Sequence, residues 1–264
     1  MNKVFKVFTT LLFTLTTATF VAIIFYLIFK GVKSFSFAFL TNELLAPIEG
    51  TVVLVVLSTL IATIFGITTA IYIERYAKKR IKKILNLSFE ILASMPSIII
   101  GLFGFTILVA LHKIFPNIQS SLLLSATTLA ILTLPYIIKA TQLGLQQVPK
   151  EFILVACATG ATKEQTILKI ELPFAKNHIL KGIFLTIARS AEDTAVIMLT
   201  GVVASYGTFK SIFEPFEALP FFIYYTTTNY ENESALNSIY VAIILLILIS
   251  TTIMALIKAT KWFR

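Results

Sequence analysis

Long apolar segments constrain the fold of this chain more than any other feature. A helix needs about 20 consecutive apolar residues to cross the hydrocarbon core of a bilayer. Six stretches reach or approach that length, at residues 4–29, 51–73, 84–111, 121–138, 179–204 and 238–257. Only 13% of the 264 residues are charged, about half the share that wets the surface of a soluble domain. We therefore predict an all-α polytopic membrane protein with six transmembrane helices, and a soluble enzyme is excluded.

The basic residues indicate which way these helices cross. Lysine and arginine in short loops remain on the cytoplasmic side. With the amino terminus inside, 17 of the 22 basic residues fall in cytoplasmic segments, four fall outside, and Arg189 lies within the fifth stretch. Both termini are therefore expected in the cytoplasm. The positive charge then faces the anionic lipids of the inner leaflet, so no nucleic-acid partner is expected. With one cysteine and two histidines, neither an intrachain disulfide nor a metal site is expected.

The longest cytoplasmic connection, residues 139–178, carries more apolar side chains than a solvated loop needs. Gly160 is expected to separate two short helices there, and Pro173 is expected to end the second. The apolar side chains either pack against the protein's own inner surface or form a docking element for a soluble partner. They are Phe152, Ile153, Val155, Ala156, Ile167, Leu168, Ile170 and Leu172.

This connection resembles the cytoplasmic loop of ABC importer permeases, whose pattern is E-A-A-x3-G-x9-I-x-L-P. The spacing from Gly160 to Ile170 and Pro173 matches that pattern. Its glutamate falls on Leu154 and its first alanine on Val155. The resemblance implies a type I ABC importer permease fold, in which this loop forms a coupling helix seated in a groove of an ATPase subunit. The residues then expected in the coupling loop are Leu154, Val155, Ala156, Gly160, Ala161, Ile170, Leu172 and Pro173.

Two further segments are similar to those of phosphate importer permeases. Residues 90–104 are similar to E-x-L-A-x-x-P-S-I-x-x-G-L-F-G. Residues 189–201 are similar to R-A-x-G-E-T-A-P-L-L-L-T-G, with Glu192, Asp193 and Val196 in place of the glycine, glutamate and proline. The segment 219–224 favours the PstA-type subunit over its PstC-type partner. The resemblance covers about residues 50–257.

This resemblance implies a permease for inorganic phosphate in the cell inner membrane. Its partners would be two ATPase subunits that carry ATP and Mg²⁺, a homologous PstC-type permease and an extracytoplasmic phosphate-binding protein. No cofactor is expected on this chain. The expected regions are a transmembrane helix with an outer loop at 1–49, the permease domain at 50–257 and a cytoplasmic tail at 258–264. The first helix is expected to be retained, because its apolar run is too long for a signal peptide and lacks a small-x-small cleavage site.

Charged residues within the fifth stretch mark a candidate translocation pathway. Arg189, Glu192 and Asp193 are spaced i, i+3 and i+4, so Arg189 can reach either acid. The cluster either fixes helix packing as a neutralised group or lines the route, where the guanidinium would offer donors to phosphate oxygens. In the third stretch, Pro96 predicts a kink or break near Met95 that either shapes helix packing or serves as a hinge. The full set expected on the pathway is Arg189, Glu192, Asp193, Thr194, Glu90, Pro96 and Ser97.

The sequence contains no phosphate-binding loop, nucleophile elbow or His-Glu-x-x-His motif. The chain is therefore expected to be a non-catalytic transport subunit that takes its energy from a partner. A permease for another oxyanion, such as tungstate, molybdate or sulfate, is the first alternative. An ion-coupled secondary transporter is the second, because intramembrane carboxylates often carry protons.

Overall fold

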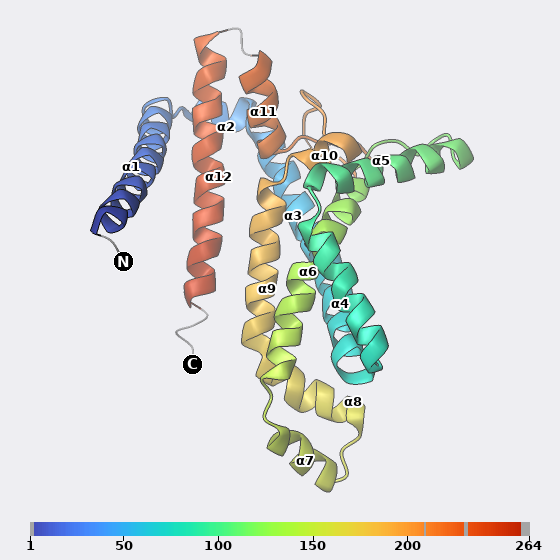
Figure 1. The fold of residues 1–264 in the computed structure, drawn as a ribbon. Coiled ribbons are helices and arrows are strands. Elements are labelled where there is room, and N and C mark those ends of the chain that lie inside the picture. The colour runs from blue at the N-terminus through green and yellow to red at the C-terminus, as the bar shows by residue number, and fades with distance from the viewer. Residues whose placement is uncertain (1–2, 209, 230–231, 260–264) are drawn as a thin grey trace.

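The computed structural model describes residues 3–208, 210–229 and 232–259. The secondary-structure elements within these residues are helical, and one isolated parallel β-bridge joins Val202 to Phe216. The predicted all-α class is confirmed. The elements, drawn in Figure 1, are α1 (Lys3–Lys33), α2 (Phe37–Asn42), α3 (Leu45–Ile71) with the π-helical turn η1 (Tyr72–Tyr76), α4 (Lys79–Ser94), α5 (Ser97–Ile114), α6 (Leu122–Gln146), α7 (Lys150–Ala158), α8 (Lys163–Thr166) with the π-helical turn η2 (Ile167–Glu171), α9 (Leu172–Glu192), α10 (Ala195–Thr200), α11 (Leu219–Asn229) and α12 (Glu233–Ala259).

Three long helices, α3, α6 and α9, form the centre of the molecule (Figure 1). They approach closely where one helix presents a glycine. A Cβ atom on Gly182 would lie 2.6 Å from the Cβ of Ala140, and one on Gly144 would lie 2.7 Å from the Cβ of Ala175. Small residues at such positions let helix backbones pack tightly in membranes, where the hydrophobic effect between helices is weak. A Cβ on Gly66 of α3 would likewise lie 2.8 Å from Ile137 Cγ2 of α6, so the three helices form a closely packed unit.

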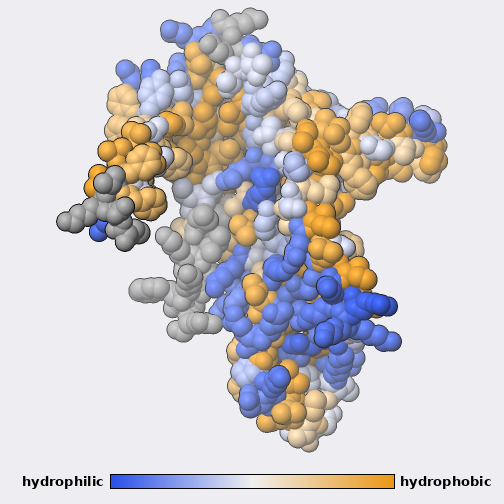
Figure 2. Space-filling model, in the orientation of Figure 1, coloured by the Kyte–Doolittle hydropathy of each residue, from blue (hydrophilic) through white to orange (hydrophobic). Residues whose placement is uncertain are grey.

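Five helices among the described residues are long and apolar enough to cross a membrane. They span Phe5–Lys33, Leu45–Tyr76, Ser97–Ile114, Leu122–Gln146 and Glu233–Thr252. The chain is thus a multi-pass membrane protein, while the sixth crossing and the side on which each terminus lies stay predictions. Figure 2 shows hydrophilic residues gathered over the lower part of the molecule, where α4 begins and α6 ends, and hydrophobic residues over the upper helices and α5.

The third apolar stretch is two helices and not one. α4 ends at Ser94 and α5 begins at Ser97, with Met95 and Pro96 in extended conformations (ψ 137° and 136°). Proline disfavours a helical conformation at the residue before it, which explains the break. The break near Met95 is therefore confirmed, and it divides the third apolar stretch between α4 and α5. α5 leaves the direction of α4 and projects to the side of the molecule (Figure 1).

The fifth apolar stretch also divides. α9 starts at Leu172, earlier than the sequence suggested, and ends at Glu192. Asp193 is extended (ψ 121°), and the short helix α10 follows. One continuous helix over residues 179–204 is therefore wrong. The end has a local cause, since the Asp193 carboxylate accepts a hydrogen bond from the Val196 N–H (2.9 Å) and so caps the next helix instead of extending the last.

Two short helices do meet at Gly160, as predicted, but Pro173 does not end the second. Helical structure is continuous from Lys163 through η2 into α9. The Leu172 N–H bonds to the Ile167 carbonyl five residues back, and Pro173 occupies the first turn of α9. A π-helical turn and a first-turn position both accommodate the missing proline N–H. Because α6 extends to Gln146, the connection between α6 and the α8–η2–α9 helix is shorter than residues 139–178.

Candidate functional site: the α7 tip and the charged residues at the end of α9

The turn between α7 and α8 is set by Gly160. Its φ of +83° lies in the left-handed region that glycine adopts without strain. The Gly160 N–H bonds to the Cys157 carbonyl (3.1 Å) and the Ala161 N–H to the Ala156 carbonyl (3.0 Å). These two bonds close a Schellman motif, and a capping box between Thr162 and Gln165 then starts α8. Hence the glycine of the permease pattern fixes the angle between the two short helices.

Apolar side chains on α7 are left uncovered. Leu154 is 67% exposed, Val155 63% and Phe152 51%, whereas Ala156 is buried. Of the residues on η2, Ile167 is buried and Leu168 is exposed. A groove of about 410 Å³ runs between α7 and the α8–η2 segment, with Val155 and Ile170 among its lining residues. Packing on the protein's own surface therefore accounts for only part of the apolar set. α7 lies at the tip of the molecule (Figure 1), and its exposed apolar side chains form a face there.

The coupling-loop residues nearest α9 have a different environment. Ile170 and Leu172 are half-buried and Pro173 is exposed. Hydrogen bonds from its own backbone N–H and from Thr162 lower the pKa of the Glu164 carboxyl. Glu164 is thus a carboxylate at neutral pH. It lies on α8, next to the α7 tip, and was not among the residues predicted for the coupling loop.

The charged residues of the fifth apolar stretch divide into two groups. Arg189 Nη2 lies 2.9 Å from Asp193 Oδ2, and the Asp193 side chain is only 2% exposed. Glu192 is exposed, and it accepts a hydrogen bond from the Ser250 hydroxyl of α12 (2.7 Å). Arg189 therefore pairs with the acid at i+4, and the acid at i+3 faces another helix. Thr194, half-buried, follows in the break between α9 and α10.

The residues predicted from the third stretch lie elsewhere. Glu90 on α4 pairs with Lys139 on α6 at 2.9 Å, and both side chains are more than half exposed. The pair borders a groove of about 360 Å³ between α4 and α6. Pro96 and Ser97 stand at the start of α5. The structure brings Arg189 and Asp193 together, whereas Glu90 pairs with Lys139. The role of the predicted residues in a translocation pathway stays a prediction.

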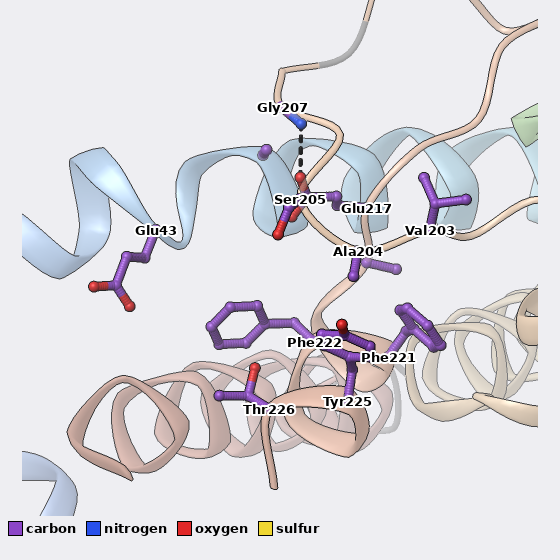
Figure 3. Close-up of a pocket in the computed structure, with 12 residues that line it drawn as sticks. Glu43, Val203, Ala204, Ser205, Gly207, Glu217, Phe221, Phe222, Tyr225 and Thr226 are labelled. Carbon is purple, nitrogen blue, oxygen red and sulfur yellow. Dashed lines mark hydrogen bonds between the residues drawn. The ribbon is translucent and has the colours of Figure 1, made fainter. Parts of the chain in front are cut away.

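A cavity at the opposite end from α7 was not predicted from the sequence. It has a volume of about 440 Å³ and lies between α11 and the loop that follows α10 (Figure 3). Glu217, 9% exposed, accepts a hydrogen bond from the Gly207 N–H (2.7 Å), and Phe221 and Tyr225 line the cavity. Ser205 and Gly207 in this loop both have left-handed backbones (φ +56° and +92°), and the glycine is a local sequence signal of this geometry. The buried carboxylate makes this cavity a poor site for an anion.

The sequence of this chain matches a known protein family. A family model described as "Binding-protein-dependent transport system inner membrane component" matches residues 62–260. The chain belongs to this family. The Mycobacterium tuberculosis (strain CDC 1551 / Oshkosh) phosphate transport system permease protein PstA 1 is 32% identical over 204 residues, which cover 76% of this chain and 65% of the relative. The match thus spans just under two thirds of that relative's length. The Haemophilus influenzae phosphate transport system permease protein PstA is 32% identical over 76% of this chain and 73% of its own.

The fold of this family member is also similar to a solved structure. A chain of the MetNI methionine ABC transporter, in an inward-facing conformation, superposes with a TM-score of 0.62 at 18% identity. The match covers 86% of this chain and 99% of that one. The ABC importer permease fold expected from the sequence is therefore confirmed, as is the resemblance to PstA-type permeases.

Proposed function

We propose that this chain is a permease subunit of an ATP-driven importer of inorganic phosphate. It works with a homologous PstC-type permease, two ATPase subunits that bind ATP and Mg²⁺, and an extracytoplasmic phosphate-binding protein. It hydrolyses no ATP itself, and both of its termini lie in the cytoplasm. The observation that carries the proposal is the uncovered apolar face of α7, held at the tip of the two central helices α6 and α9.

The α7 face suits a soluble partner. An apolar helix face laid into a groove is a common mode of recognition between proteins. Leu154 occupies the position of the glutamate in the permease pattern, so the contact here depends on apolar burial instead of a charge. Because α7 connects α6 to the α8–η2–α9 helix, a partner that moves α7 moves α6 and α9, two of the three central helices.

The substrate follows from the two PstA relatives and from Arg189. The guanidinium offers planar donors that match phosphate oxygens, but Asp193 already compensates its charge. A compensated cation holds an anion weakly, and conduction needs sites that release their ion. High affinity for phosphate then resides in the separate binding protein, and this chain forms part of the translocation pathway.

Uptake of radiolabelled phosphate tests this function. The chain is expressed with its partner subunits in cells that lack other phosphate importers, and competition is measured with unlabelled phosphate, sulfate, molybdate and tungstate. We expect ATP-dependent uptake that only phosphate suppresses. Suppression by another oxyanion at equal concentration would reassign the substrate. Uptake that continues without ATP and follows an ion gradient would instead support a secondary transporter.

Two matched variants test the α7 contact separately. Phe152→Ser removes an exposed aromatic from α7, and Phe213→Ser removes a more exposed one (68%) from the opposite end. Co-purification of the ATPase subunits in detergent is the measurement. Phe152→Ser is expected to release the ATPase and Phe213→Ser to retain it. Retention by both variants would contradict the docking role of α7.

A further inference from the structure

Both π-helical turns of the central helices lie near the α7 tip. η1 ends α3 at Tyr72–Tyr76, and η2 joins α8 to α9 at Ile167–Glu171. Isolated π-helical turns are rare in proteins and occur frequently at functional sites. Here each turn supplies one member of the same ion pair, although 96 residues separate the two in the sequence. The turns therefore place two charged side chains that no local sequence signal connects.

This ion pair ties three helices together. Arg75 Nε of η1 donates to Glu171 Oε2 of η2, and Arg75 Nη2 donates to the Leu145 carbonyl near the end of α6 (2.7 Å). The Glu171 side chain is 3% exposed and the Arg75 side chain 20%. One guanidinium thus holds the ends of α3, α6 and the helix leading into α9. We refer to Arg75, Glu171 and the Leu145 carbonyl as the Arg75 link.

A second set of contacts holds α8 against the same turn. Lys163 Nζ donates to the Arg75 carbonyl (2.5 Å) and lies 4.0 Å from the centroid of the Tyr76 ring. The Tyr76 hydroxyl donates to Glu164 Oε1 (3.3 Å). These contacts are exposed, so each contributes little alone. Together with the Arg75 link they fix α8 on the end of α3.

We infer that the Arg75 link transmits movement of the α7–α8 segment to α3, so that Arg75 and Glu171 are positioning residues for coupling. This inference rests on the proposed function, because it takes α7 as the ATPase contact. α6 and α9 continue directly from the short helices, but α3 does not. Without the link, a displacement at the tip reaches α3 through the exposed contacts of Lys163 and Glu164 and through side-chain packing higher in the bundle. With it, the three central helices move as one unit.

The double variant Arg75→Gln/Glu171→Gln tests the inference. It removes both charges and so avoids an unpaired buried carboxylate, which would destabilise the protein. The complete complex, with the second permease, the ATPase and the binding protein, is placed in proteoliposomes. Radiolabelled phosphate uptake and ATP hydrolysis are measured together. We expect the ATPase to remain bound and to hydrolyse ATP, while the uptake per ATP falls at least about threefold.

A matched control exists in the same turn. Glu74 of η1 is as buried as Glu171 (3% exposed) and pairs with Lys82 of α4 at 2.6 Å. The variant Glu74→Gln/Lys82→Gln neutralises that pair without touching α8 or η2. It is expected to keep its uptake per ATP. An equal loss in both double variants would reduce the Arg75 link to general stability and overturn the inference.

Two further outcomes are decisive. If Arg75→Gln/Glu171→Gln keeps a wild-type ratio of uptake to hydrolysis, the Arg75 link does not transmit movement. If this variant fails to assemble, Arg75→Lys decides, because a lysine keeps the charge beside Glu171 but lacks the fork that reaches both acceptors. We then expect a reduced ratio, and an unchanged one overturns the inference. Failure of the unmodified chain to assemble with an ATPase would instead contradict the proposed function.

Discussion

Replacing Arg189 by alanine leaves a buried carboxylate without its cation. Asp193 is 2% exposed at its side chain and lies 2.9 Å from Arg189. Removing one partner of a buried ion pair costs roughly 3–5 kcal/mol. Arg189 is itself 36% exposed, so water screens part of the interaction and about 3 kcal/mol is the better figure. That loss would lower the melting temperature by roughly 6–12 °C. Lost uptake in Arg189→Ala would therefore mix transport with stability.

The double variant Arg189→Ala/Asp193→Asn separates the two effects. It removes both charges, and the asparagine oxygen still accepts the Val196 N–H that caps α10. Melting of the purified complex in detergent and radiolabelled phosphate uptake are measured for the wild type, Arg189→Ala, Asp193→Asn and the double variant. We expect Arg189→Ala to lose both stability and uptake. The double variant should recover a melting temperature close to the wild type and still fail to transport.

The reasoning fails if the double variant transports phosphate. Arg189 would then serve only to neutralise Asp193, and the cluster would be a packing device. A melting temperature unchanged in Arg189→Ala would show instead that water reaches Asp193, so that the burial argument is wrong.

Three other substitutions have outcomes that follow from local geometry. Gly160→Val should strain the left-handed turn by about 1–2 kcal/mol. It should weaken co-purification of the ATPase without affecting membrane insertion. Gly207→Val is the control that should keep the ATPase bound, because Gly207 is also left-handed and, as at Gly160, no atom lies within 4 Å of the added Cβ. Gly144→Leu should separate α6 from α9 at Ala175 and sharply increase sensitivity to proteolysis. Pro173→Ala should change the melting temperature little, because the helix already runs through this position; a large change would contradict the role of η2.

Local sequence signals predicted much of the fold. Apolar runs located α1, α3, α6 and α12, and Pro96 located the break between α4 and α5. Gly160 located the turn at the tip because only a few residue types adopt its conformation. Pro173 misled, because the effect of a proline depends on the hydrogen bonds of the preceding turn. The π-helical turn η2 lets the helix continue through Pro173, and no sequence pattern predicted this turn.

The candidate site was predictable only in part. Spacing allowed Arg189 to reach either Glu192 or Asp193, and the choice depends on where α9 ends and on Ser250 in a distant helix. Arg75 and Glu171 lie 96 residues apart, so their pairing requires the packed structure. Sequence patterns identify which charges lie in apolar surroundings, whereas long-range packing decides which of them meet.

The two breaks in the helices suggest where movement of the central unit ends. α5 begins after Pro96 and α10 after Thr194, and these two helices pack together: a Cβ on Gly101 of α5 would lie 3.0 Å from the Ala195 carbonyl oxygen of α10. Met95, Pro96 and Asp193 have extended backbones, so the helical hydrogen bonding is interrupted at both breaks. We therefore expect a displacement carried by α3, α6 and α9 to be absorbed at these breaks. Arg189 lies one turn before the second break, so its ion pair with Asp193 spans the end of α9.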